Sequence, residues 1–153
     1  MQRPRTTLFL GSIAAVLYFS EGLPYGIVRE LVPAFLRFRH VETRMGSISA
    51  MEAGRGAPIV LLHGLGATKA SFLPTVAALA PDHRAIAIDL LGFGDSDKPI
   101  AAGYDPRFFA RSVEALLDAL AIERAHFVGN SMGGRVTLEV GLRTPERTDR
   151  IVL

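Results

Sequence analysis

The sequence predicts an α/β fold, a mostly parallel sheet with helices on both of its faces. Short apolar runs such as Ile59-Val60-Leu61-Leu62 suit strands that are buried on both sides of a parallel sheet. Between these runs lie segments whose apolar residues recur at helical spacing, and strands that alternate with helices form βαβ units. The chain has 153 residues, 49% of them hydrophobic, which is enough for one domain with a buried core.

The strands are expected after the first 38 residues. Residues 39–46 and 47–54 are predicted to form a hairpin, and the glycines of residues 54–58 predict a turn after it. The buried strands of the parallel part are expected at residues 59–62, 85–88, 125–128 and 150–153.

Three helices are expected between these strands. The first covers residues 71–80, with Ser71 as its N-cap. The second begins at Asp105-Pro106, a capping residue followed by proline in the first turn, and carries an apolar stripe to Leu120. The third covers residues 135–142 and ends before a proline.

The first 38 residues differ in character from the domain expected at residues 39–153. Residues 6–28 carry a single charge, at Glu21, follow a basic stretch and are long enough to cross a bilayer, although Pro24 interrupts them. We therefore expect an apolar N-terminal helix that associates with a membrane, ahead of a cytoplasmic domain. A buried helix packed on the domain is the alternative.

Composition excludes several classes of function. The chain has no cysteine, so it holds no disulfide, thiolate metal site or cysteine nucleophile. Its net charge of +2 comes from residues 1–44, which contain six basic and three acidic side chains, and the remainder is nearly neutral. A nucleic-acid-binding surface needs basic residues clustered on a folded face, so nucleic acid is not expected as a partner. The sequence indicates no particular oligomeric state.

Three glycine-containing loops follow three strands of the predicted parallel sheet. They are residues 63–66 (HGLG), 89–97 (DLLGFGDSD) and 129–134 (GNSMGG). Ligands of open α/β sheets bind beyond the carboxyl ends of the strands. Because all three loops leave such ends, we expect them to share one edge of the sheet and to form the site.

The loop GNSMGG has the G-x-S-x-G pattern of a nucleophile elbow, with Ser131 between Gly129 and Gly133. A serine on a sharp strand-to-helix turn projects its hydroxyl away from the sheet, and side chains at the two glycines would collide with neighbouring backbone. The following helix offers N–H groups, including that of Met132, to a developing oxyanion. The alternative is a glycine-rich turn with an incidental serine.

The loop HGLG is expected to complete an oxyanion hole. Its glycines, Gly64 among them, let the backbone approach a substrate carbonyl, so that the N–H of Leu65 can act together with that of Met132. We interpret His63 as a structural residue, because it lies beside this loop whereas a general base must reach the serine from the other side.

The loop at residues 89–97 holds three aspartates, which could suggest a metal site. Its glycines and apolar residues favour a turn that packs over the sheet edge, with Asp95 and Ser96 bonded to loop amides. The spacing of His40, His83 and His126 is unlike that of metal ligands. We therefore expect neither a metal nor a cofactor.

Four ordered segments, PIVLLHGLG, DLLGFGDSDKP, LLDALAIERAHFVGNSMGG and PERTDRIVL, together resemble the α/β-hydrolase superfamily over residues 39–153. The resemblance implies Ser131 as nucleophile and the amides of Leu65 and Met132 as oxyanion hole. Serine at this position is unlike the haloalkane dehalogenase and epoxide hydrolase branches, which use aspartate.

The motif GNSMGG is similar to that of esterases, lipases and the C–C bond hydrolases that cleave meta-cleavage products of aromatic rings. The last group usually has a longer glycine-rich oxyanion loop than HGLGAT. We therefore expect a small-molecule substrate with an ester-type bond first, hydrolysed through an acyl-enzyme on Ser131, and C–C bond hydrolysis second.

The family order of catalytic residues is serine, then acid, then histidine, and no histidine follows Ser131 here. Asp149 precedes the last strand, on the wrong edge of the sheet for a triad acid. We therefore expect a sheet truncated after the nucleophile helix, as in a fragment or a fusion product. A hydrolase-like fragment without turnover is the non-enzymatic alternative.

The segment LYFSEGLPYGIVRELVPAFLR, within residues 1–38, bears a second and weaker resemblance. It is similar to the first transmembrane segment of major-facilitator-type transporters. That similarity implies either a chimeric chain or a hydrolase with a membrane anchor.

Overall fold

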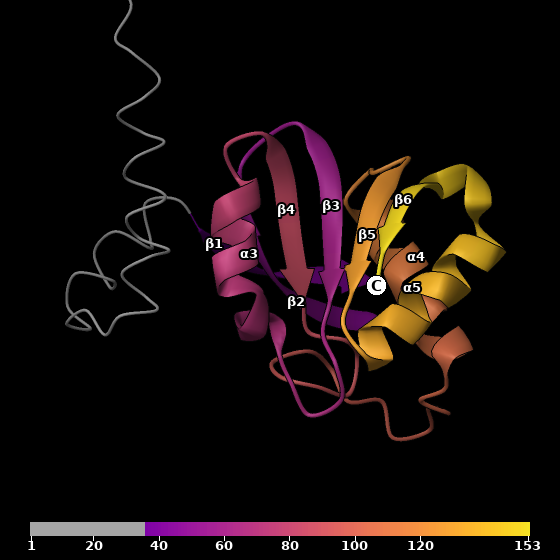
Figure 1. Ribbon diagram of the computed structural model, residues 1–153. Helices are drawn as coiled ribbons and strands as arrows, with labels where there is room; N and C mark the ends of the chain where they lie inside the picture. Colours follow the sequence, from indigo (N-terminus) through magenta and orange to yellow (C-terminus); the bar gives the residue numbers. More distant parts are fainter. Residues whose placement is uncertain (1–35) are drawn as a thin grey trace, which may run out of the picture.

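The computed structural model describes residues 36–153, which form one six-stranded sheet in the order β1-β2-β4-β3-β5-β6 (Figure 1). Strands β3, β4, β5 and β6 are mutually parallel, and the β1–β2 hairpin joins them through antiparallel pairing of β2 with β4. The predicted mostly parallel α/β sheet is therefore confirmed. The strands are β1 (Arg37–Thr43), β2 (Gly46–Ala53), β3 (Ala57–Leu62), β4 (His83–Ile88), β5 (Ala125–Gly129) and β6 (Thr148–Val152).

Helices cover both faces of this sheet, also as predicted. Helix α3 (Leu73–Leu79) packs on one face, and α4 (Pro106–Ala119) and α5 (Met132–Arg143) pack together on the other. Two short 3-10 helices, η2 (Lys69–Phe72) and η3 (Pro145–Arg147), precede α3 and β6. Figure 1 shows α3 and the α4–α5 pair at opposite sides of the sheet.

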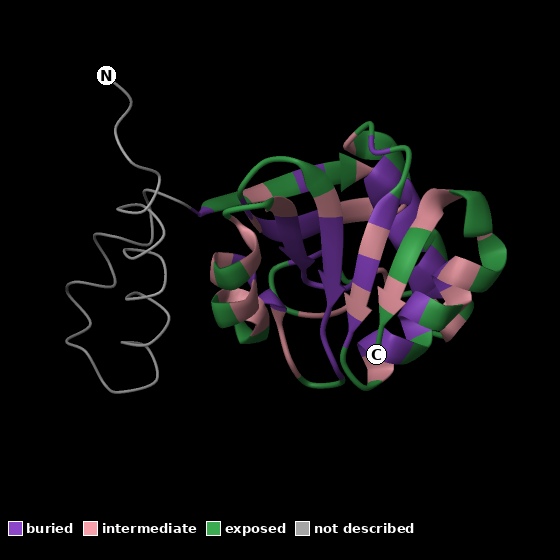
Figure 2. Cartoon of the chain, turned by 45° about the horizontal axis from the view of Figure 1, so that its top comes forward, coloured by how far each residue is buried: buried purple, intermediate pink, exposed green. Residues whose placement is uncertain are grey.

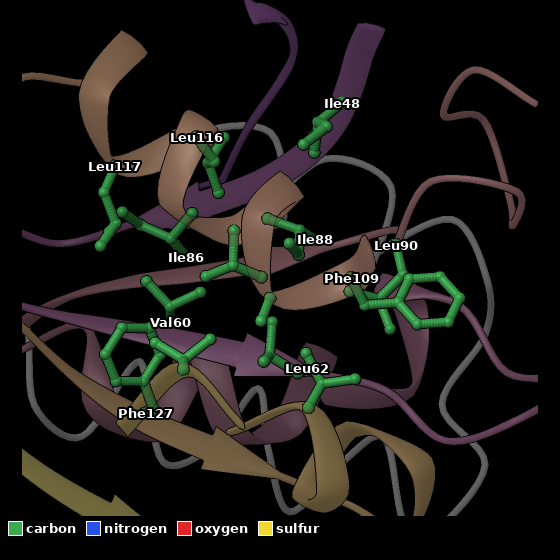
Figure 3. Packing of buried hydrophobic residues seen from close by; sticks show 14 of the residues in the cluster. Ile48, Val60, Leu62, Ile86, Ile88, Leu90, Phe109, Leu116, Leu117 and Phe127 are labelled. Carbon is green, nitrogen blue, oxygen red and sulfur yellow. The ribbon is translucent and has the colours of Figure 1, made fainter. Parts of the chain in front are cut away.

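The core has two layers because successive residues of each central strand point to opposite faces. Val60 and Leu62 of β3 face the layer under α4 and α5, whereas Ile59 and Leu61 face the layer under α3. Figure 3 shows the first layer, in which Leu116 and Leu117 of α4 lie over apolar side chains of β2, β3, β4 and β5. Burying each such side chain contributes about 1.5–3 kcal/mol to the free energy of folding. Strand β3 is buried along most of its length (Figure 2). This packing makes β3, β4 and β5 a rigid base for the loops that leave them.

The helix starts differ in how well the sequence predicts them. Asp105 caps α4 as expected, its side chain accepting a hydrogen bond from the Phe108 N–H at 2.7 Å. The prediction for Ser71 is wrong, because this residue lies inside η2 and α3 begins at Leu73 without a side-chain cap. Helix α5 begins at Met132, three residues earlier than predicted, because the glycines after it are part of its first turn.

The predicted N-terminal helix and its membrane association, residues 6–28, lie outside the described residues. Within residues 36–153 no helix has the length and apolar character needed to cross a membrane. The division of the chain at residue 38 stays a prediction, and β1 begins at Arg37.

Candidate active site

Three loops meet at one edge of the sheet, at the carboxyl ends of β3, β4 and β5. The register aligns these ends, because Leu62 of β3 pairs with Ile88 of β4 on one side and with Gly129 of β5 on the other. The loops HGLG, DLLGFGDSD and GNSMGG therefore begin side by side at the lower edge of the sheet in Figure 1. The sequence predicts this juxtaposition correctly, and it is the place where open α/β sheets bind ligands.

Ser131 stands on a strained turn between β5 and α5. Its backbone has φ 55° and ψ −113°, a region that residues with a side chain rarely adopt, and its side chain is exposed. The Gly133 N–H donates to the Asn130 carbonyl at 2.9 Å and so closes the turn around it. The serine hydroxyl is thus presented to solvent at the start of a helix, where the positive end of the helix dipole lies.

Two glycines enforce this turn by allowing close backbone contact. A Cβ added to Gly129 would overlap the backbone of Gly133 and Gly134, and one added to Gly133 would overlap the Leu62 carbonyl at the end of β3. The first turn of α5 therefore presses against both β5 and β3. This contact supplies the physical reason for the glycines of the G-x-S-x-G pattern.

The loop HGLG lies against this turn. A Cβ built on Gly64 would lie 3.4 Å from the Ser131 Cβ and 3.9 Å from its Oγ. Among the described residues, the N–H groups of Leu65 and Met132 donate no hydrogen bond to another protein group. Two unused backbone donors in the loops that flank an exposed serine hydroxyl are the groups from which an oxyanion hole is built.

His63 is fully buried, and both of its ring nitrogens are engaged. Nε2 accepts a hydrogen bond from the Leu90 N–H at 3.1 Å, and Nδ1 lies 2.8 Å from the Gly64 carbonyl oxygen. This pairing requires the proton on Nδ1, which donates to the carbonyl. The ring also packs edge-on against Phe93. With both nitrogens occupied, His63 links two loops and is not available to take a proton from Ser131.

The three aspartates of the third loop are all paired, two of them with the same lysine. Asp89 is fully buried and pairs with Lys69, whose Nζ lies 2.6 Å from Oδ2 and whose N–H donates to Oδ1 at 2.7 Å. Asp97 accepts a hydrogen bond from the Ser47 N–H. The expectation that Asp95 would bond a loop amide is wrong, because its carboxylate pairs with Lys69 at 2.8 Å.

Ser96 is buried in the same loop and bonds in two directions. Its hydroxyl donates to the Asp89 carbonyl at 2.7 Å and accepts from the Ser49 N–H at 2.8 Å. The expectation that Ser96 would bond a loop amide is also wrong, because the N–H that its hydroxyl accepts from belongs to β2. These bonds tie the third loop to the sheet edge. The described residues hold no group of three or more acidic or histidine side chains arranged for a metal ion.

Lys69 is the residue of this region that sequence reasoning missed. It is 7% exposed, although lysine is rarely buried without a charged partner. Burial alone would lower the pKa of the Lys69 ammonium, but hydrogen bonds to Asp89 and Asp95 and the attraction of both carboxylates outweigh it and hold the pKa above its ordinary value. The same hydrogen bond lowers the pKa of Asp95. A single lysine after a glycine-rich loop carries no sequence signal for such a network.

Residues 57–153 match the family model for the alpha/beta hydrolase fold. The chain belongs to the α/β-hydrolase family. The predicted resemblance is confirmed at this level, and the proteins to which the chain is similar include several hydrolase enzymes.

The curated and solved relatives of this α/β-hydrolase chain are longer proteins. It is 40% identical over 105 residues to 2-hydroxymuconate semialdehyde hydrolase from Pseudomonas sp. (strain CF600), covering 67% of this chain and 37% of that protein. A solved meta-cleavage product hydrolase superposes with a TM-score of 0.72 at 36% identity, over 75% of this chain and 44% of the other. An epoxide hydrolase from Vigna radiata gives a TM-score of 0.74 at 27% identity, over 77% and 39%. The chain spans less than half the length of each.

The other histidines of this α/β-hydrolase chain lie away from Ser131. His83 is the first residue of β4 and His126 is the second residue of β5, so both lie at the edge of the sheet opposite to Ser131. His40 lies on the edge strand β1. Asp149 is likewise near the start of β6 and pairs with Arg124. Residues 36–153 therefore place a serine and two backbone donors at the site, and within them no histidine or acid side chain forms a hydrogen bond with the serine hydroxyl.

Proposed function

We propose that this chain carries the nucleophile and oxyanion hole of a serine hydrolase acting on carboxylic ester-type bonds. One observation carries the proposal: an exposed serine on a strained strand-to-helix turn lies against a glycine loop, and the two loops hold unused N–H groups at Leu65 and Met132. Strain of about 1–3 kcal/mol at one residue persists only where the surrounding structure enforces it, and such strain clusters at active sites.

The arrangement supports acyl transfer. The Ser131 oxygen would add to the substrate carbonyl, whose π electrons move to oxygen, and the N–H groups of Leu65 and Met132 would donate to that oxyanion. The hydroxyl proton of Ser131 passes to water as the bond forms. Collapse of the intermediate then expels the alkoxide, which takes up a proton from water to give the alcohol, and leaves an acyl group on Ser131 for hydrolysis. Each oxyanion donor is worth about 3–4 kcal/mol in such reactions. No step needs a metal or an organic cofactor.

Cleavage of a C–C bond next to a carbonyl is the second candidate. It is favoured by similarity at 40% and 36% identity to a 2-hydroxymuconate semialdehyde hydrolase and a meta-cleavage product hydrolase. The epoxide hydrolase similarity is lower, at 27% identity, and Ser131 stands where that branch uses aspartate. The same two donors would serve the C–C reaction, so the substrate separates the two candidates.

A hydrolase-like chain without turnover is the non-enzymatic alternative. Its motivation is that the described residues bring no general base to Ser131, since His63 is bonded at both nitrogens and the other histidines lie elsewhere. Without a base, the proton leaves the hydroxyl inefficiently and both acylation and deacylation are slow. We therefore expect the nucleophile to react slowly in the chain as it stands.

The test is covalent labelling of Ser131 by a fluorophosphonate, followed by intact mass and peptide mapping. We expect one adduct per chain, on the peptide that contains Ser131, and none in Ser131→Ala. Adduct that persists in the alanine variant would sink the nucleophile assignment, whereas wild-type protein that stays unlabelled after prolonged incubation would support the chain without turnover. Release rates of p-nitrophenol from its acetate ester and of dienoate from a meta-cleavage product, compared in both proteins, then rank the substrate classes or reveal no turnover.

A further inference from the structure

The loop that carries Leu65 is open to solvent at its tip and has few internal contacts. Leu65 is 76% exposed, and a Cβ built on Gly66 would meet nothing within 4 Å. Inside the loop, the Gly64 carbonyl accepts two hydrogen bonds, from the Ala67 N–H at 3.1 Å and from His63 Nδ1 at 2.8 Å. The Gly64 carbonyl and the Leu65 N–H belong to one planar peptide unit, so the direction of this N–H depends on the turn that Ala67 closes and on where the two ends of the loop are fixed.

Both ends are fixed to the same short segment at the end of β4. At the first end, His63 accepts the hydrogen bond from Leu90 described above. At the second end, Lys69 binds Asp89 twice, through its N–H and through its ammonium. The backbone of Asp89 is bonded to the sheet, because its N–H donates to the Ser49 carbonyl of β2 at 2.9 Å.

The Asp89 carboxylate, which binds the second end of the loop, is itself held in one position. Besides both bonds from Lys69, its Oδ2 accepts the Asp95 N–H at 2.9 Å. Gly94 passes so close that an added Cβ would overlap the carboxylate. Three donors converge on one fully buried carboxylate, and the space around it leaves no room for it to move.

A buried ion pair of this kind is weak support for stability. Removing two charges from water costs several kcal/mol per ion, and apolar replacements of similar volume are often neutral or stabilising. What a buried pair with convergent hydrogen bonds does supply is a single geometry for the segments it joins. Here the segments it joins are the end of β4 and the end of the loop that carries Leu65.

We propose that Lys69 is a positioning residue for the oxyanion hole. Its pairing with Asp89 fixes the far end of the HGLGAT loop, and the loop in turn aims the Leu65 N–H beside that of Met132, toward the space in front of Ser131. The inference rests on the proposed function, because it assigns Lys69 a role in the same oxyanion hole.

The test uses phenylboronic acid as a tetrahedral probe that needs no leaving group. Its boron accepts a lone pair of the Ser131 oxygen, the hydroxyl proton goes to solvent, and the anionic boronate places an oxygen in the oxyanion hole. Binding to the full chain is followed by the amide shifts of Leu65 and Met132 in ¹H–¹⁵N spectra. In wild type we expect both amides to shift, and Ser131→Ala to abolish the response. If wild type gives no Ser131-dependent binding, the proposed function fails as well.

Lys69→Met keeps the apolar stem and removes the ammonium. We expect boronate affinity to fall tenfold or more, and the Leu65 amide shift on binding to diminish, while Lys69→Arg retains affinity within about threefold. The matched control is Lys98→Met, since Lys98 is an exposed lysine of the neighbouring loop that donates to the Gly94 and Ser96 carbonyls. Affinity equal to wild type in folded Lys69→Met would overturn the proposal.

Asp95→Asn covers the case in which Lys69→Met does not fold. Asp95 is exposed and holds the outer side of the same ammonium, so its replacement loosens Lys69 without emptying the core. We expect a two- to fivefold loss of boronate affinity with unfolding unchanged. An affinity indistinguishable from that of Lys98→Met would contradict the positioning role.

Discussion

The proposed nucleophile turn around Ser131 and the proposed oxyanion loop, residues 63–68, meet at one sheet edge but are held by different kinds of interaction. The turn around Ser131 is fixed by backbone packed against backbone, at Gly129 and Gly133, and its serine makes no side-chain cap. The oxyanion loop has open space around Gly66 and is fixed by polar anchors at its ends, His63 and Lys69. The turn is therefore held by close packing and the loop by hydrogen bonds.

The difference follows from what each element has to present. A serine at φ 55° relaxes unless its neighbours leave no room for another conformation, so close packing is the suitable restraint. An oxyanion donor instead needs an N–H that faces outward with no partner of its own, and packing over Leu65 would cover it. Anchors at a distance leave that N–H free while still fixing its direction.

Gly133→Ala gives the largest expected effect, because it attacks the packed turn directly. The added methyl would overlap the Leu62 carbonyl, so either α5 or β3 has to move. We expect a loss of about 3 kcal/mol or more in the free energy of unfolding, at the upper end of overpacking penalties. Urea unfolding followed by circular dichroism measures it.

Gly66→Ala is the matched control in the oxyanion loop. Gly66 has φ 73°, so alanine is strained there by about 1–2 kcal/mol, but the new methyl meets nothing. A loss from Gly66→Ala as large as that from Gly133→Ala would contradict the distinction between the two loops.

Ser131→Gly is expected to stabilise the protein. Glycine adopts the backbone angles of this turn without strain, and after allowance for its greater freedom in the unfolded chain we expect a gain of about 1 kcal/mol. Ser131→Ala also removes the hydroxyl but keeps the strain, so it separates the two effects in the same unfolding experiment. Equal stabilities of the two variants would mean that the turn stores no strain.

The same contrast explains which parts of the site the sequence predicts. The packed turn leaves a mark in the sequence, because only glycine fits at Gly129 and Gly133, and the pattern G-x-S-x-G follows from those contacts. The polar anchors at the ends of the oxyanion loop leave no such mark in the sequence. Lys69 and Asp89 are twenty residues apart, and nothing local distinguishes them from a surface lysine and a loop aspartate until the strands bring them together.

The fold divides in a similar way. Periodicity predicts the central strands and α4, whose Asp105 cap is a local interaction of a side chain with its own helix. It misplaces the start of α3, where η2 precedes the helix, and the start of α5, where Gly133 and Gly134 are helical because tertiary packing requires small residues. Local propensity therefore fails where contacts between distant segments decide the conformation.

The polar anchor should make the oxyanion loop sensitive to pH, whereas the packed turn should not be. Asp95 faces Lys69, with His40 and Lys98 near it, and its pKa is lowered, so its pairing is present above about pH 4 and is lost as pH falls through the lower folded value. Burial of Lys69 opposes a raised pKa, but its carboxylate partners prevail, so the pair persists until pH exceeds the ordinary lysine value of about 10.4.

We therefore expect the amide shift of Lys69 to stay constant between about pH 5 and 9 and to change in acid, and the Gly133 amide to show no such step. Asp95→Asn should remove the acid step at Lys69. A step of equal size in that variant would assign the titration to another group. The measurement is a pH series of ¹H–¹⁵N spectra on both proteins.

Leu65→Ala should have the smallest effect on stability, and its size separates the side chain of Leu65 from its amide. Leu65 is 76% exposed, so we expect the free energy of unfolding to change by no more than about 0.5 kcal/mol. Because the loop is fixed at His63 and Lys69, the backbone N–H should keep its direction, and labelling of Ser131 by fluorophosphonate should proceed at nearly the wild-type rate. A large loss of labelling with unchanged stability would show that the Leu65 side chain itself contacts the reagent or orders the loop, and the end anchors would then be insufficient to explain the geometry.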